Sequence, residues 1–148
     1  GTYKGVTTAF LANHFSHVHS VEPSKNLYES AAKLFKDKNI TLYNDISENI
    51  FPSLLPKLNG KINFWLDGHS SGGITFKGEK DCPIEDELST IKNNLSNFTK
   101  MTILIDDVRA FTSKDRNGYP STDYLVDWSR ENKFSWKIEH DIFVMVNY

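Results

Sequence analysis

The sequence alternates between strand-like and helix-like hydrophobic patterns, and this alternation constrains the fold more than any other feature. Short apolar runs are separated by segments whose apolar residues recur three, four and seven positions apart, as on amphipathic helices. Only the last two strand-like runs follow each other without a helix. We therefore predict an α/β sandwich with a mostly parallel sheet that ends in an antiparallel hairpin. The predicted strands are residues 17–22, 40–43, 61–66, 101–105, 134–139 and 142–148.

The predicted helices each place their apolar residues along one face. They carry Val6, Ala9 and Phe10; Leu27, Ala31, Leu34 and Phe35 after a Ser24 cap; a short stretch after Ser47 limited by Pro52 and Pro56; Ile84, Leu88, Ile91, Leu95 and Phe98 after Pro83; and Leu125 and Trp128 after Pro120 and Ser121. Pro83 stands at a favoured first-turn position.

One element is missing from this pattern. The first helix follows the run from Gly1 to Gly5, and a glycine turn of this type normally follows a strand. We therefore expect the first strand of the fold to be absent, which leaves two strand edges unpaired. We expect residues 17–22 and 61–66 to pair directly, with a homo-oligomer built through the open edges as the competing outcome.

Length and charge narrow the classes of partner. The 148 residues fit one domain, residues 1–148, and a single cysteine, Cys82, favours a reducing compartment with the cytoplasm as the default. No apolar run approaches the ~18 residues of a membrane span, so we expect no membrane partner. The 17 basic residues do not exceed the 19 acidic ones, and we expect no nucleic-acid partner.

Acidic residues gather where the predicted strands end, and the ligand crevice of an open α/β sheet lies outside those carboxyl ends. Glu22 lies 21 positions after Gly1, close to the offset of about 20 at which an acid meets ribose hydroxyls in nucleotide-binding units. The Gly1–Gly5 turn can also expose backbone N–H groups to a ligand. The alternative is an ordinary turn at the start of a helix.

Asp67, Asp106 and Asp107 form the second acidic group. Adjacent carboxylates repel each other unless a cation or hydrogen bonds compensate, and oxygen ligands favour magnesium, calcium or manganese. The alternative is that these acids cap helices or pair with Arg109, Lys77 or Lys80. In a regular strand Asp106 and Asp107 would point to opposite faces, so a shared ion requires the strand to end between them.

From Gly1 to the terminal hairpin, the order of these motifs resembles the class I S-adenosylmethionine-dependent methyltransferases. The resemblance implies a Rossmann-like fold and S-adenosylmethionine as cofactor. It implies that Gly1, Thr2 and Gly5 lie against the methionine part of the cofactor, that Glu22 holds its ribose and that Asp45 contacts its adenine.

The runs Phe64-Trp65-Leu66-Asp67-Gly68-His69 and Ile103-Leu104-Ile105-Asp106-Asp107 are similar to the metal-bearing strand ends of cation-dependent O-methyltransferases of the catechol and macrocin type. By that similarity Asp67, Asp106 and Asp107 would hold magnesium, which would bind the substrate oxygen and lower its pKa. Catechol-type enzymes place a lysine base after the first aspartate, and this chain has none there. His69 is the candidate base instead, and a loop histidine without a catalytic role is the alternative.

The implied function is magnesium-assisted O-methyl transfer to a hydroxyl of a small molecule or sugar. A metal-independent enzyme with His69 as base and a non-catalytic S-adenosylmethionine-binding domain are the alternatives. Residues 70–73 are predicted to form a lid over the site, with a passive flexible loop as the alternative. Arg109 and Phe111 either orient the acceptor or brace their loop. Solvated or capping positions are predicted for Glu85 and Glu87, and structural positions for His14, His17, His19 and His140.

Overall fold

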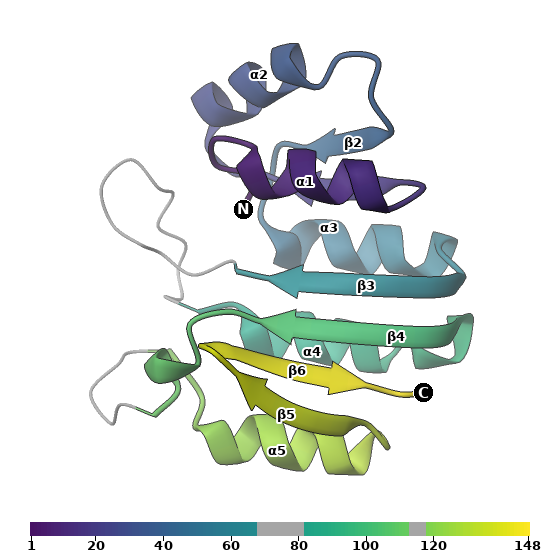
Figure 1. Ribbon diagram of the computed structural model, residues 1–148, viewed down its shortest axis with the longest axis vertical. Coiled ribbons are helices and arrows are strands. Elements are labelled where there is room, and N and C mark those ends of the chain that lie inside the picture. Colours follow the sequence, from purple (N-terminus) through teal and green to yellow (C-terminus); the bar gives the residue numbers. More distant parts are fainter. Residues whose placement is uncertain (68–81, 113–117) are drawn as a thin grey trace. The chain divides into compact units, whose positions relative to one another are not determined.

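The computed structural model describes residues 1–67, 82–112 and 118–148. These residues divide into two compact units, the first formed by residues 1–50 and the second by residues 51–67, 82–112 and 118–148. Helices and strands alternate until a final hairpin, which confirms the predicted α/β class with its parallel ladders and antiparallel end (Figure 1). Among the described residues no helix is long and apolar enough to cross a membrane.

The first unit is a two-stranded parallel sheet with its connecting helices. Its elements are α1 (Val6–His14), β1 (Val18–Val21), α2 (Lys25–Leu34) and β2 (Ile40–Tyr43), and α3 (Ser47–Leu54) begins near its end. The ladder runs from Val18 opposite Ile40 to Val21 opposite Tyr43. The two strands therefore end side by side, so the residues after Val21 and Tyr43 share one edge of the sheet.

Helix α1 does not bury the face that the sequence predicts. Val6 is 78% exposed and Phe10 is 60% exposed, whereas Thr8 is buried. The Thr8 hydroxyl lies 3.1 Å from the Ser20 hydroxyl of β1. The inward face of α1 is thus fixed by a polar contact to the strand. In α2, Leu34 is likewise 60% exposed, although Ala31 of the same predicted stripe is buried.

The second unit contains a four-stranded sheet in the order β3-β4-β6-β5. β3 and β4 are parallel, while β6 runs antiparallel to both β4 and β5. Figure 1 shows α4 behind this sheet and α5 beside β5. The elements are η1 (Leu55–Lys57), β3 (Gly60–Leu66), α4 (Ile84–Lys92), η2 (Leu95–Asn97), β4 (Phe98–Ile105), η3 (Val108–Ala110), α5 (Thr122–Glu131), β5 (Ser135–Glu139) and β6 (Ile142–Val146), where η denotes a 3-10 turn.

The core of the second unit joins α4 and α5 to the inner face of the sheet. Its fully buried side chains include Leu88, Ile91, Met101, Ile103, Ile105, Leu125, Phe143 and Met145. Helix α4 is shorter than its predicted apolar stripe, because the chain leaves the helix after Lys92 and Phe98 opens β4. The Asn94 amide donates to the Thr90 carbonyl at 2.9 Å, which satisfies one of the last helical acceptors.

The predicted ladder between residues 17–22 and 61–66 is wrong. Among the described residues β1 pairs with β2 and β3 pairs with β4, and no ladder joins the two sheets. The Thr2 N–H donates to the Val21 carbonyl at 3.0 Å. The segment that leads into α1 therefore occupies the Val21 carbonyl, an acceptor that the predicted ladder would have needed.

Candidate functional site

The Gly1–Gly5 turn is anchored to the end of β1. Besides the Thr2 bond to Val21, the Gly5 N–H donates to the Thr2 carbonyl at 2.9 Å, which closes the turn. The Thr2 hydroxyl lies 2.8 Å from the Ser20 hydroxyl. Thr2 is only 4% exposed, so these bonds form in a largely dry environment and hold the turn in one position.

The two glycines of the turn have different roles. Gly5 precedes α1 with φ of 81°, and a Cβ built there would lie 2.6 Å from Cζ of Phe35. This position therefore requires glycine, both for its backbone conformation and for the packing of Phe35. A Cβ at Gly1 would lie 3.3 Å from Oε2 of Glu22. The absence of a side chain at Gly1 thus leaves space beside the Glu22 carboxylate, and a ligand that contacts the backbone would need this space.

Glu22 is the first residue after β1, and its carboxylate joins two segments of the chain. Oε2 accepts the Tyr3 N–H at 2.7 Å, and Oε1 accepts the Ser24 N–H at 3.0 Å. Glu22 is 4% exposed. Such hydrogen bonds offset the loss of hydration that a buried carboxylate suffers. The structure therefore brings Glu22 and the glycine turn together, as the sequence predicts.

Asp45 lies at the same edge, two residues after β2. Its Oδ1 accepts the Ile46 N–H and the Asn49 side-chain amide, both at 2.8 Å. The neighbouring Asn44 amide donates to the Glu22 carbonyl at 2.8 Å and so ties the ends of β1 and β2 together. The turn, Glu22 and Asp45 form one polar edge in the first unit, which we call the carboxyl edge of β1 and β2.

In the second unit, Asp67 and Asp106 follow paired strands. Leu66 lies opposite Ile105 in the ladder, and the Asp106 N–H continues it by donating to the Leu66 carbonyl at 3.1 Å. Asp106 Oδ1 accepts the N–H of Asp107 at 2.8 Å. β4 ends at Ile105 and Asp107 has φ of 57°, so the regular strand has ended before both aspartates.

The three aspartates do not converge on a cation site. Asp107 forms an ion pair with Arg109, which also pairs with Asp141. Among the residues that the structure describes, no group of three or more histidine, cysteine or acidic side chains could hold a metal ion. The prediction that Asp67, Asp106 and Asp107 share magnesium therefore stays a prediction, and in this structure Asp107 pairs with Arg109 instead. The same ion pairs give Arg109 a bracing role.

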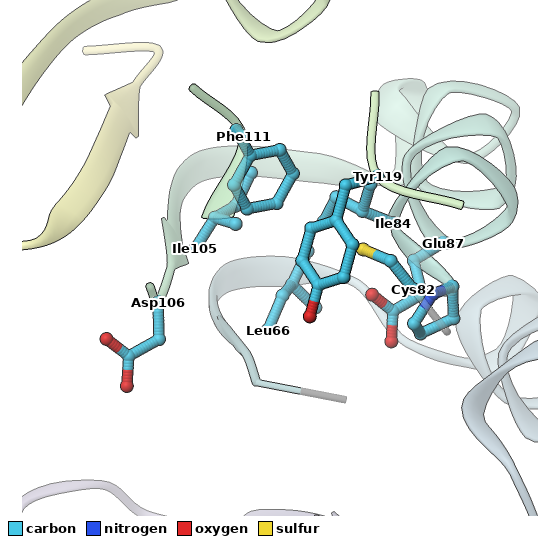
Figure 2. Close-up of a pocket in the computed structure, with 9 residues that line it drawn as sticks. Leu66, Cys82, Ile84, Glu87, Ile105, Asp106, Phe111 and Tyr119 are labelled. Atoms are coloured by element: carbon cyan, nitrogen blue, oxygen red, sulfur yellow. The ribbon is translucent and has the colours of Figure 1, made fainter. Parts of the chain in front are cut away.

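A small pocket lies beside the ends of β3 and β4. Its cavity volume is about 10 Å³, close to the space that one water molecule needs. The lining residues are Leu66, Cys82, Pro83, Ile84, Glu87, Ile105, Asp106, Phe111 and Tyr119. In Figure 2 the Asp106 side chain points away from the group formed by Tyr119, Cys82 and Glu87.

Glu87 is the residue in this region that the sequence interpretation misplaced. It was predicted to be solvated or capping, but it is 3% exposed and lines the pocket. Its position one turn before Ile91 and one residue before Leu88 on the buried face of α4 was the signal that could have identified it. Phe111 is buried and packs edge-to-face on Tyr119 at 5.3 Å between ring centroids, so its ring supports the pocket wall. His69 and the predicted lid at 70–73 lie outside the described residues.

No protein-family model matches this sequence, and no curated protein matches it. Three solved structures are similar to the chain over 99% of its length. A Clostridium thermocellum protein described as an rRNA methylase is 14% identical, with 83% of that chain covered and a TM-score of 0.58. An rRNA methylase from Streptococcus thermophilus is 15% identical, with 81% covered and a TM-score of 0.52. Magnesium protoporphyrin IX methyltransferase from Synechocystis PCC 6803, with bound S-adenosylhomocysteine, is 14% identical, with 68% covered and a TM-score of 0.50.

The likeness identifies the fold. The chain has the Rossmann-like fold of these methyltransferases, with parallel strands and a closing antiparallel hairpin, as the sequence predicts.

The prediction that nucleic acid is not a partner is wrong. Two of the similar structures carry this fold over nearly the whole of the chain and are of rRNA methylases. The net charge of −2 sums over all residues, whereas RNA recognition depends on local surface charge, on stacking and on hydrogen bonds to exposed bases. The charge balance therefore excludes no class of partner.

Proposed function

We propose that the chain is an S-adenosylmethionine-dependent methyltransferase whose first unit binds the cofactor at the carboxyl edge of β1 and β2. The observation that carries the proposal is the Glu22 carboxylate, which holds the Tyr3 N–H and thereby joins the glycine turn to the strand end. A turn and an acid in this arrangement form a polar site for a nucleoside with a charged extension. The methyltransferase fold of the whole chain supports the same conclusion.

Within the described part of the chain, the residues at this edge have free hydrogen-bond acceptors that suit the donors of the cofactor. An ionised carboxylate has about four lone-pair sites, and Glu22 uses two of them for backbone N–H groups. Each oxygen thus keeps one acceptor site for a ribose hydroxyl. Asp45 uses Oδ1 for two hydrogen bonds, and its Oδ2 accepts none among the described residues, which leaves it for the amino group of adenine. Gly1 and Gly5 would lie against the methionine part.

The cofactor supplies an activated methyl group on a sulfonium. The protein's contribution is to hold this group in line with the acceptor atom and to exclude competing water. We propose a hydroxyl oxygen as acceptor, on the resemblance of the strand ends to O-methyltransferases, with His69 as the base. The described residues group no three potential metal ligands, so the proposal assigns no step to a metal ion.

Calorimetry with S-adenosylhomocysteine tests the binding site. We expect Glu22→Gln to weaken binding by about 10- to 150-fold, which corresponds to the loss of a charged hydrogen bond of about 1.5–3 kcal/mol. Glu29→Gln is the matched control, because Glu29 is exposed on α2 of the same unit. Unchanged affinity in the folded Glu22→Gln protein would overturn the ribose assignment, and no binding by the wild-type chain would overturn the proposed cofactor.

Methyl transfer is tested with radiolabelled S-adenosylmethionine and two sets of acceptors. Sugar hydroxyls occur both in free sugars and in RNA, so one set contains free sugars and small phenols and the other contains ribosomal RNA. Label in a methyl ether of either set supports O-methyl transfer and identifies the acceptor class. Label on a ring nitrogen or carbon would contradict the hydroxyl assignment while supporting methyl transfer itself.

A further inference from the structure

Two histidines lie on the same exposed face of β1, away from the buried Val18. His17 precedes the strand and His19 is its second residue, and alternate side chains of a strand point to the same side. Their ring centroids are 4.7 Å apart, with an angle of 57° between the ring planes. Both side chains are accessible to solvent. This pair takes no part in the cofactor site, which lies at the opposite end of the strand.

Each imidazole is held through one nitrogen by a hydroxyl of the neighbouring strand β2. His17 Nε2 lies 2.9 Å from the Thr41 hydroxyl, and His19 Nδ1 lies 2.9 Å from the Tyr43 hydroxyl. When such a hydroxyl accepts the ring N–H, the other ring nitrogen carries the lone pair. The ring nitrogens that remain available as ligands are Nδ1 of His17 and Nε2 of His19, which form no hydrogen bond with the described residues.

We propose that His17 and His19 form a binding site for one divalent transition-metal ion, such as Zn²⁺, Ni²⁺ or Cu²⁺. Imidazole nitrogen is a preferred ligand of these ions. Two nitrogens that each lie about 2.0–2.1 Å from a shared ion are at most about 4.2 Å apart, and the two ring centroids are 4.7 Å apart. Thr41 and Tyr43 act as outer partners that orient the ligands, as in most protein metal sites.

The described residues hold no group of three or more potential ligands, so in the proposed site the two imidazoles are the protein ligands from this part of the chain and water completes the coordination.

Copper binding tests the proposal, because Cu²⁺ binds imidazole sites more tightly than the other divalent ions. Calorimetry and electron paramagnetic resonance of the wild-type chain with Cu²⁺ alone should show one ion with two nitrogen ligands. We expect His17→Gln or His19→Gln to lower the affinity by about 100-fold, since the second ligand of a chelate acts at high effective concentration. His14→Gln is the matched control, because His14 is exposed and its Nδ1 bonds to the Phe10 carbonyl of its own helix.

A third variant examines the outer partners. Thr41→Val keeps both imidazoles but removes the hydroxyl that orients His17, and we expect it to weaken copper binding about 10-fold. Urea unfolding midpoints establish that each variant is folded. The proposal is overturned if His17→Gln and His19→Gln bind Cu²⁺ as tightly as the wild type, or if the spectrum shows a single nitrogen ligand. Neither result depends on S-adenosylmethionine binding.

Discussion

Replacing Gly5 by alanine should destabilise the first unit through two separable effects. The backbone at Gly5 has φ of 81°, a left-handed conformation that costs a residue with a Cβ about 1–2 kcal/mol. The new Cβ would also lie 2.6 Å from Cζ and 2.9 Å from Cε2 of Phe35. Phe35 is 7% exposed, so the ring cannot swing into solvent without losing its packing. Overpacking of this kind typically costs about 1–3 kcal/mol, which gives a total of about 2–5 kcal/mol.

Gly60→Ala separates the two effects. Gly60 has φ of 86°, but nothing lies within 4 Å of its added Cβ. Alanine at either position changes the unfolded chain in the same way, so the difference between the two variants reports the clash with Phe35. We expect Gly5→Ala to lower the free energy of unfolding by about 1–3 kcal/mol more than Gly60→Ala does. Urea unfolding followed by circular dichroism measures both.

A double variant decides whether Phe35 causes the difference. Phe35→Leu removes the ring atoms that the alanine would meet, so it should cost less in the Gly5→Ala background than in the wild type. The coupling should exceed the 0.3–0.5 kcal/mol or so within which independent substitutions add. Equal losses in Gly5→Ala and Gly60→Ala, or additive effects with Phe35→Leu, would refute the argument from packing.

Three further predictions concern pH, capping and metal. Burial, and then the neighbouring His17, lower the pKa of His19 below its ordinary value of 6.5. The unfolded chain therefore binds the proton first as the pH falls, so the free energy of unfolding should stay level above about pH 6.5 and decrease below it. His19→Gln should remove this part of the pH dependence of the urea midpoint. Ser121→Ala removes the hydroxyl that accepts the Tyr124 N–H at the start of α5, and should lower the free energy of unfolding by about 0.5–2 kcal/mol, as measured by thermal unfolding. Ser135→Ala is the control, because Ser135 is exposed and its replacement should leave the free energy of unfolding unchanged. EDTA should leave the calorimetric affinity for S-adenosylhomocysteine unchanged, because the proposed contacts of Glu22 and Asp45 use no metal ion; a loss of affinity would contradict this.

The sequence predicts those elements whose apolar residues reach the core. β4 and α4 follow their hydrophobic periods, and Met101, Ile103 and Leu88 are fully buried. The period fails in α1, where Thr8 faces β1 through a hydroxyl contact while Val6 stays exposed. Periodicity counts apolar residues alone and cannot detect an inward face made by hydrogen bonds.

The sequence predicts a candidate site in each unit. Glu22 and the glycine turn were found because their spacing is set by a strand and its flanking helix. The pairing of Asp107 with Arg109 depends on a left-handed backbone at Asp107, for which aspartate is only a weak signal. The sequence therefore does not predict the local backbone conformation at which Asp107 pairs with Arg109.

Acids at the ends of these strands have a common local function. Asp45 accepts the N–H of Ile46, and Asp106 accepts the N–H of Asp107, each one position further along the chain. Such bonds satisfy backbone donors where the chain leaves the sheet, and they account for carboxylates there without a cation. Acidic residues at strand ends therefore do not by themselves indicate a metal site.

Glu22 differs because one of its bonds is not local. Its carboxylate reaches the N–H of Tyr3, 19 positions away, as well as that of Ser24. Amide hydrogen exchange should distinguish this role: Glu22→Gln should lower protection at Tyr3 and Ser24 together, since one glutamine oxygen cannot replace two carboxylate oxygens. Asp45→Asn should affect only the amides around Ile46. If the Tyr3 amide exchanges equally fast in the wild type and in Glu22→Gln, the carboxylate does not hold the turn, and the link between the glycine turn and the end of β1 on which the cofactor site depends would be lost.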